Sequence, residues 1–151
     1  SREDEAASPE VAAAAGRGET ILMAEDDELV RGLCKGILER GRYRVLLARD
    51  GEEAIAVFKD NADSIDLALL DVVMPKKGGR AVLEAIRTLK PELPVLLASG
   101  YSHQVLEMAG LNKTQYEIVS KPFRPSELLQ RIRQLLDERG NVERDASRNS
   151  L

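Results

Sequence analysis

Short apolar runs alternate with segments of helical periodicity between residues 20 and 139, and this alternation is the strongest constraint on the fold. Short, continuous apolar runs are typical of strands that are buried on both faces, as in parallel sheets. We assign such strands to 20–24, 43–48, 65–70, 94–98 and 116–119. Strands that alternate with helices form right-handed βαβ units. The pattern therefore predicts an α/β domain whose doubly wound, five-stranded parallel sheet is covered by helices on both sides.

The intervening segments predict helices with different clarity. Apolar residues between 29 and 38 recur at helical spacing. Asp50, with Glu53 three residues later, is typical of a capping box at the start of a second helix. Further helices are expected at 82–89 and 125–136. Residues 102–115 contain a Gly and an Asn that interrupt the pattern, so we expect the fourth helix to be short or irregular.

The two ends of the chain differ from residues 20–139, for which we predict one folded domain. Residues 1–19 are rich in Ala and acids and contain few large apolar side chains, so we expect a flexible linker. Residues 140–151 are polar and lack periodicity, and we expect a flexible C-terminal tail. On the last helix, Arg131 and Arg133 are expected to lie on a solvated face.

Composition excludes several classes of protein. Asp and Glu number 26 against 22 Lys and Arg, for a net charge of −4, so a basic nucleic-acid surface is not expected. The single cysteine, Cys34, excludes an internal disulfide bond. No apolar run approaches the roughly 20 residues that cross a bilayer, and the acidic N-terminus does not resemble a secretion signal. We therefore expect a cytoplasmic domain without direct contacts to nucleic acid or membrane.

Polar residues follow the strands at the edge where such sheets bind ligands. Glu25 and Asp26 come after the first strand, Asp71 ends the third, Ser99 ends the fourth, and Lys121 follows the fifth. Carboxylates that are packed together repel, and a hard divalent cation relieves this repulsion. Oxygen-only ligands favour Mg²⁺. A carboxylate beside Mg²⁺ and an ammonium group can attack phosphorus, so the pattern predicts an aspartyl-phosphate chemistry.

Four segments of the chain together resemble the receiver domain of response regulators, the CheY-like family. They are 21–31, 69–75 with the following Gly79, 94–101 and 121–123, and they occur in the family's order and at its spacing. The resemblance covers residues 20 to about 139. It implies the (βα)5 flavodoxin-like fold, with strand order 2-1-3-4-5.

The resemblance also implies a ligand set and a reaction. Asp71 would accept a phosphoryl group from a phosphohistidine of a histidine kinase or a histidine phosphotransfer domain. Glu25 and Asp26 would hold Mg²⁺, together with Asp71 and the backbone carbonyl of Val73. Such a domain is a signalling phosphoacceptor that promotes its own phosphorylation and dephosphorylation, and it is not a conventional enzyme.

The remaining motif residues imply a switch. Ser99 matches the switch hydroxyl and Lys121 the phosphoryl-binding amine, and the Lys121–Pro122 peptide is expected to be cis. The face formed by 102–115, 116–119 and the last helix would respond to phosphorylation, and it is also a candidate homodimer interface. Ile118 stands where the family often has an aromatic switch residue, so this face is not expected to report through ring rotation.

The parent protein is less well defined by the resemblance. The segments 16–22 and 99–101 resemble receivers fused to histidine kinases, so we favour the C-terminal receiver of a hybrid sensor histidine kinase. A single-domain regulator is the alternative. We do not expect a DNA-binding domain after residue 139.

Other functions remain open at this point. A degenerate receiver would act only as a docking module. A small aspartate-based phosphatase needs a second Asp two residues after the nucleophile, where this chain has Val73. A flavodoxin-like cofactor binder needs a phosphate-binding loop after the first strand, where Glu25, Asp26 and Asp27 would repel a phosphate. Asp27 is either a further metal ligand or, as we favour, an anion at the start of a helix.

Overall fold

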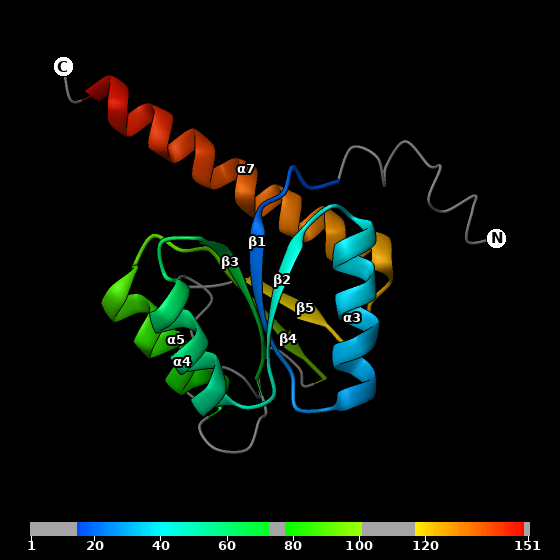
Figure 1. The fold of residues 1–151 in the computed structure, drawn as a ribbon. Helices are drawn as coiled ribbons and strands as arrows, with labels where there is room; N and C mark the ends of the chain where they lie inside the picture. The colour runs from blue at the N-terminus through cyan, green and yellow to red at the C-terminus, as the bar shows by residue number, and fades with distance from the viewer. Residues whose placement is uncertain (1–14, 73–77, 101–116, 150–151) are drawn as a thin grey trace.

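The computed structural model describes residues 15–72, 78–100 and 117–149, with the backbone alone for 140–149. Within these residues a five-stranded parallel sheet has the order β2-β1-β3-β4-β5, as predicted (Figure 1). The strands are β1 (Thr20–Ala24), β2 (Arg44–Ala48), β3 (Ile65–Asp71), β4 (Val95–Ser99) and β5 (Glu117–Ser120). The described helices are α3 (Glu28–Arg40), α4 (Gly51–Asn61), α5 (Gly79–Leu89) and α7 (Pro125–Asn149). The expected fourth helix, at 102–115, lies outside the described residues.

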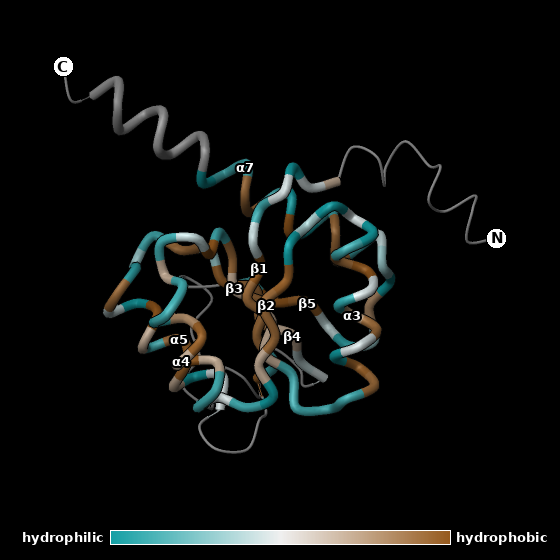
Figure 2. The backbone as a smooth tube through the Cα atoms, viewed as in Figure 1, coloured by the Kyte–Doolittle hydropathy of each residue, from teal (hydrophilic) through white to brown (hydrophobic). Residues whose placement is uncertain are grey.

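Two hydrophobic clusters form the core, one on each face of the sheet. Alternate residues of β1 point to opposite faces, so Leu22 packs with α4 and α5, whereas Ile21 packs with α3 and α7. Leu22 and Ile21 are both fully buried. In Figure 2 the strands in the middle of the domain are mostly hydrophobic, and hydrophilic residues are found along the surrounding helices and loops. Burial on both faces explains why the strands lack the apolar–polar alternation of half-exposed sheets.

Side-chain caps begin two of the helices. Asp27 Oδ1 accepts a hydrogen bond from the Val30 N–H at 3.1 Å, so this acid caps α3, in agreement with the interpretation we favoured. Asp50 caps α4 by accepting from the Glu53 N–H at 2.8 Å. The Glu53 carboxylate accepts from the Arg49 N–H at 3.3 Å, one residue before the position that a regular capping box uses.

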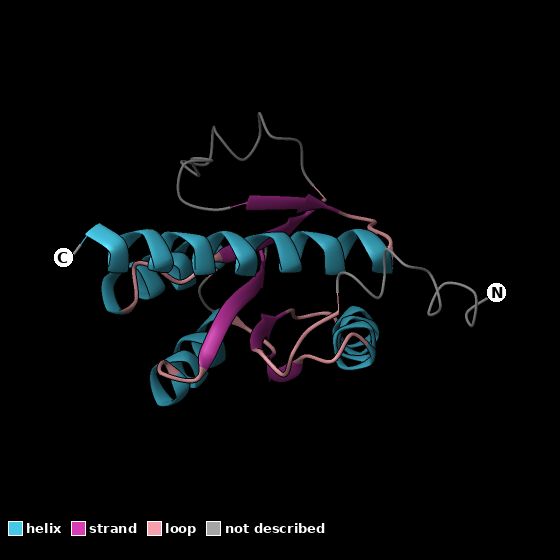
Figure 3. Ribbon diagram, turned by 90° about the horizontal axis from the view of Figure 1, so that it is seen from above, coloured by secondary structure: helices cyan, strands magenta, loops and turns pink. Residues whose placement is uncertain are grey.

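Contacts of the domain begin before the expected boundary at residue 20, and its last helix runs past the expected boundary at residue 139. The Gly16 and Gly18 amides donate to the Gly41 and Arg42 carbonyls. A side chain at Gly16 would lie 2.5 Å from the Tyr43 ring, so the close approach requires a glycine. At the other end, α7 continues to Asn149 as one helix (Figure 3) and passes beyond the sheet. Residues 140–149 are therefore helical. The sequence did not indicate this helix, because these residues have no apolar periodicity. Their flexibility stays a prediction.

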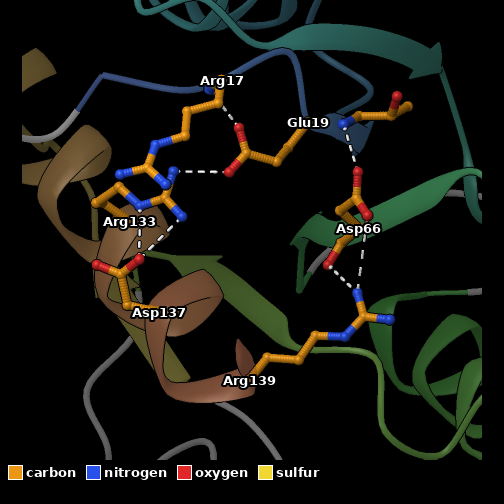
Figure 4. Close-up of polar contacts among 7 residues, drawn as sticks. Arg17, Glu19, Asp66, Arg133, Asp137 and Arg139 are labelled. Atoms are coloured by element: carbon orange, nitrogen blue, oxygen red, sulfur yellow. Dashed lines mark hydrogen bonds and ion pairs between the residues drawn. The ribbon is translucent and has the colours of Figure 1, made fainter. Parts of the chain in front are cut away.

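A polar network joins α7 to the segment before β1 (Figure 4). Arg133 pairs with Glu19 at 2.7 Å and with Asp137 at 2.9 Å. On β3, Asp66 accepts from the Thr20 N–H at 2.9 Å, and its carbonyl accepts from Arg139 at 3.1 Å. The expectation that Arg133 lies on a solvated face is therefore wrong, because its side chain is only 15% exposed and pairs with Glu19 of the segment before β1. Arg131 is half-exposed, with 42% of its side chain accessible, and it pairs with Glu117 of β5 at 3.4 Å.

None of the helices in the described part of the chain combines the length and the apolarity that a membrane span requires.

Candidate functional site

The register of the parallel sheet brings the polar residues to one edge. Ala24 pairs with Leu70, and Asp71 pairs with Ala98, so the ends of β1, β3 and β4 are level. Ser99 pairs with Ser120, which places Lys121 one residue beyond the end of β5. Because all strands run the same way, the residues that follow them collect at this carboxyl edge.

Three carboxylates meet there. One oxygen each from Glu25, Asp26 and Asp71 lies within 4.8 Å of the other two. Glu25 and Asp71 are buried, whereas Asp26 is exposed. The sequence prediction that these acids converge agrees with this geometry. In a low-dielectric setting such a group of like charges is costly unless cations compensate it.

Lys121 supplies one compensating charge. Its Nζ donates to Glu25 Oε2 at 2.9 Å and lies 3.4 Å from Asp71 Oδ2. Its backbone N–H donates to the Ser99 carbonyl at 2.8 Å, which ties the lysine to β4. The Lys121–Pro122 peptide is cis, as predicted. Lys121 therefore bridges a carboxylate that follows β1 and the carboxylate at the end of β3.

Burial and these charges shift the pKa of two groups at the site, Glu25 and Lys121. Burial raises the pKa of Glu25, and the negative charge of Asp71 adds to this, although the hydrogen bond from Lys121 opposes it. Burial on its own would lower the pKa of Lys121. The hydrogen bond to Glu25 and the charges of Asp71 and Glu25 outweigh that cost, so the Lys121 pKa is raised. The ammonium form is therefore favoured in the folded protein.

The donor set fits a hard divalent cation. Mg²⁺ binds oxygen ligands at about 2.1 Å, so opposite ligands of its octahedron are about 4.2 Å apart. Carboxylate oxygens within 4.8 Å of one another need only a small closing movement, or an intervening water, to reach that geometry. The site opens to solvent at Asp26, which suits an ion that keeps several of its waters.

Two further residues of the predicted site have a less complete description. Ser99 is buried at the end of β4, next to the carboxyl edge. Val73, whose carbonyl was expected to be a metal ligand, lies outside the described residues. Gly79 begins α5 close to the site, and a side chain there would lie 2.8 Å from the Asp71 carbonyl oxygen. A glycine at this position therefore lets α5 start against the backbone of Asp71.

Two features near the site were not singled out from the sequence. Arg31 of α3 donates to the carbonyls of Glu25 and Asp26, a contact that an Arg one turn into the helix could have suggested. Leu29 and Leu33 belong to the apolar pattern of 29–38, yet their exposed fractions are 72% and 59%. Together with Glu28 and Gly32 they line an open hollow on α3. The two leucines thus form a small exposed apolar surface at the start of α3.

Curated relatives of this chain are transcriptional regulators. The chain is 38% identical over 116 residues to the transcriptional regulatory protein CpxR of Escherichia coli K12, which covers 77% of this chain and 48% of CpxR. It is 34% identical over 116 residues to the alkaline phosphatase synthesis transcriptional regulatory protein PhoP of Bacillus subtilis, covering 77% of this chain and 48% of PhoP. The chain thus spans about half the length of these relatives. They give no support to the expected hybrid kinase parent.

Solved receiver domains share both fold and sequence with this chain. The receiver domain of the hybrid histidine kinase CckA is 34% identical, with a TM-score of 0.67 over 78% of this chain and 98% of that one. A CheY-like receiver domain protein from Methanospirillum hungatei JF-1 is 30% identical, with a TM-score of 0.69 over 82% and 98% of the two chains. The family model of the response regulator receiver domain matches residues 21–133. The chain therefore belongs to the family of response regulator receiver domains.

Proposed function

We propose that Asp71 accepts a phosphoryl group from a phosphohistidine, with Mg²⁺ held by Glu25, Asp26 and Asp71. Receiver domains generally bind Mg²⁺, and they act as signalling domains that interact with histidine kinases or phosphotransfer proteins. The observation that carries the proposal is the group of three carboxylates within 4.8 Å, two of which contact the Lys121 ammonium. Asp71 is the member of this group that lies at the end of a central strand.

The proposed transfer is a displacement at phosphorus. A carboxylate oxygen of Asp71 attacks, a P–O bond forms, and the P–N bond to the histidine breaks. The electron pair of that bond stays on the imidazole, which leaves as a neutral ring because its other nitrogen carries a proton. When bound, Mg²⁺ would neutralise charge on the phosphoryl oxygens.

Lys121 has the position to serve the same reaction. Its Nζ is already 3.4 Å from Asp71 Oδ2, and the raised pKa of Lys121 favours the positively charged ammonium form. A phosphoryl group on Asp71 would bring new anionic oxygens to this ammonium and compete with Glu25 for it. The hydroxyl of Ser99, at the end of β4, would donate a hydrogen bond to another phosphoryl oxygen.

We propose that this exchange of partners drives the switch. The Lys121 N–H donates to the Ser99 carbonyl at 2.8 Å, so a movement of either residue is passed to β4 and β5. The responding face would comprise β5, α7 and residues 102–115, and it is the candidate homodimer interface. Phosphorylation would shift the population of two states through their different contacts. NMR shifts on addition of beryllofluoride should then cluster from Ser99 to Lys121; shifts confined to β1 and its loop would contradict the switch.

The phosphodonor protein needs a surface beside the acidic site, and the exposed pair Leu29 and Leu33 offers one. Both residues lie on α3, which begins directly after the loop that carries Glu25 and Asp26. We propose that a helical element of a histidine kinase or a phosphotransfer domain docks against this apolar surface. For the output, the names of the curated relatives favour control of transcription over a hybrid kinase parent.

Intact-mass spectrometry tests the phosphoacceptor role. The protein is incubated with Mg²⁺ and acetyl phosphate, beside Asp71→Asn and the control Asp63→Asn, which changes an exposed acid before the same strand. We expect one added phosphate on the wild type and on Asp63→Asn, and none on Asp71→Asn. No phosphate on the wild type would favour a docking module instead. Repeated turnover of a phosphate ester, without a stable phosphoprotein, would favour a phosphatase.

A further inference from the structure

Arg31 contacts the backbone of the acidic loop from the first turn of α3. Its Nη1 donates to the Glu25 carbonyl at 2.9 Å and to the Asp26 carbonyl at 3.3 Å. One nitrogen therefore binds the main chain of both acids that follow β1. The contact with the Glu25 carbonyl is partly buried and so partly shielded from solvent, whereas the contact with the Asp26 carbonyl is exposed.

Other contacts hold the loop from the opposite side. The Glu25 N–H donates to the Ala48 carbonyl of β2 at 3.1 Å, which extends the sheet by one residue. The Asp27 N–H donates to Glu25 Oε1 at 3.2 Å, and Asp27 caps α3. Arg31 thus binds two carbonyls of a loop in which the Glu25 and Asp27 N–H groups have other partners. The direction of the two acidic side chains depends on the backbone that these contacts fix.

We propose that Arg31 is a positioning residue that holds Glu25 and Asp26 in the geometry that binds Mg²⁺. The inference rests on the proposed function, because it assigns Arg31 a part in the same metal site. Arg31 would raise the affinity for Mg²⁺, because a loop that already has the binding geometry loses less conformational freedom when the ion binds.

The positive charge of Arg31 has an opposite effect on the metal. A guanidinium group near a cation site repels the cation, so removal of the charge alone would tighten Mg²⁺ binding. Removal of the two hydrogen bonds would weaken it. Asp26 is exposed, so solvent screens the repulsion, whereas the loss of the backbone contacts acts directly on the ligands. We therefore expect the positioning effect to be the larger one.

Arg31→Met removes the guanidinium and keeps an aliphatic stem of high helix propensity. Arg40→Met is the matched control, because Arg40 lies on the same helix and its Nε donates to a backbone carbonyl, that of Gly36, at 3.1 Å. Both variants change the net charge equally. Arg31→Lys keeps the charge and one donor nitrogen.

The first readout is Mg²⁺ affinity, followed through the amide NMR signals of Glu25, Asp26 and Asp71. We expect Arg31→Met to bind Mg²⁺ three- to tenfold more weakly than Arg40→Met, and Arg31→Lys to recover part of the loss. Equal or tighter binding by Arg31→Met would overturn the inference. A wild type that does not bind Mg²⁺ would instead contradict the proposed function.

The second readout needs no metal. Hydrogen exchange of the Asp27 N–H in EDTA reports whether the loop is held, because this group donates to Glu25 Oε1. We expect exchange at least threefold faster in Arg31→Met than in Arg40→Met, while global stability in urea stays the same in both variants. Equal exchange rates would show that Arg31 does not position the loop. A matching loss of global stability in Arg31→Met would show a general structural role and would also overturn the inference.

Discussion

Asp26→Asn should stabilise the domain without metal and remove its response to Mg²⁺. The oxygens of Asp26, Glu25 and Asp71 lie within 4.8 Å of one another. Two unit charges at this distance repel by about 0.9 kcal/mol in water, and by about 3.5 kcal/mol at an effective dielectric constant near 20. Asp26 is exposed, so the lower figure applies to its repulsion from Glu25 and to its repulsion from Asp71, and the two together amount to about 2 kcal/mol. The attraction that Asp26 loses toward Lys121 reduces the expected gain to about 1 kcal/mol.

Urea unfolding in EDTA at low ionic strength measures this gain. Asp27→Asn is the control, because it removes one charge at the next position and keeps a residue that caps helices equally well. With Mg²⁺ at ten times its dissociation constant, the wild type should gain about 1.4 kcal/mol. Asp27→Asn should gain about the same amount, and Asp26→Asn little. High salt should shrink the metal-free gain of Asp26→Asn, since its charge is screened.

Two results would refute this reasoning. If Asp26→Asn is less stable than the wild type in EDTA, the like charges are not the dominant interaction of this carboxylate. If Mg²⁺ stabilises Asp26→Asn as much as it stabilises the wild type, Asp26 is not a ligand. The same variant should also fail to become phosphorylated, because the proposed transfer needs the ion.

Further predictions concern the lysine, the cysteine and the exposed leucines. Lys121→Met should cost about 2 kcal/mol of stability at pH 7, because it leaves the buried Glu25 carboxylate without its ammonium partner. The Lys121 pKa is raised in the folded protein, so the stabilisation by its ammonium group is complete below about pH 10.5 and is lost as the pH rises through the pKa of the folded state. The unfolding free energies of the wild type and Lys121→Met, measured in urea, should therefore converge at alkaline pH. Burial raises the pKa of Cys34 to about 11, so a thiol reagent at pH 8 should label the native protein far more slowly than the urea-unfolded chain; equal rates would contradict the buried position. Replacement of Leu29 and Leu33 by Gln should slow phosphotransfer from a cognate kinase at least fivefold and leave phosphorylation by acetyl phosphate unchanged; an equal loss with both donors would argue against a docking role.

The sheet and the acidic site could be predicted from the sequence because both depend on local patterns. Strands that are buried on both faces appear in the sequence as apolar runs. In a parallel sheet the residues that follow the strands lie at the same edge, whatever the details of packing. For this reason Glu25 and Lys121, which are 96 positions apart, could be placed at the same edge of the sheet from the sequence.

The features that the sequence did not indicate depend on three-dimensional packing. The spacing of 29–38 identifies an amphipathic helix, but the width of its buried stripe follows from how α3 meets β1 and α7, and Leu29 and Leu33 fall outside it. Arg133 is held by Glu19, which is 114 positions away, and nothing in the local sequence marks such a pair. The helical extension of α7 past residue 139 has no apolar periodicity that would reveal it.

The position of the phosphoryl group tests the central claim most directly. Borohydride reduces an acyl phosphate to an alcohol, so the protein phosphorylated by acetyl phosphate and Mg²⁺ would acquire homoserine in place of the modified aspartate. Tandem mass spectrometry of the digested product then reads the site. The account predicts homoserine at position 71 and at no other acid. Reduction at Glu25, at Asp26 or at an acid outside the carboxyl edge of the sheet would contradict it.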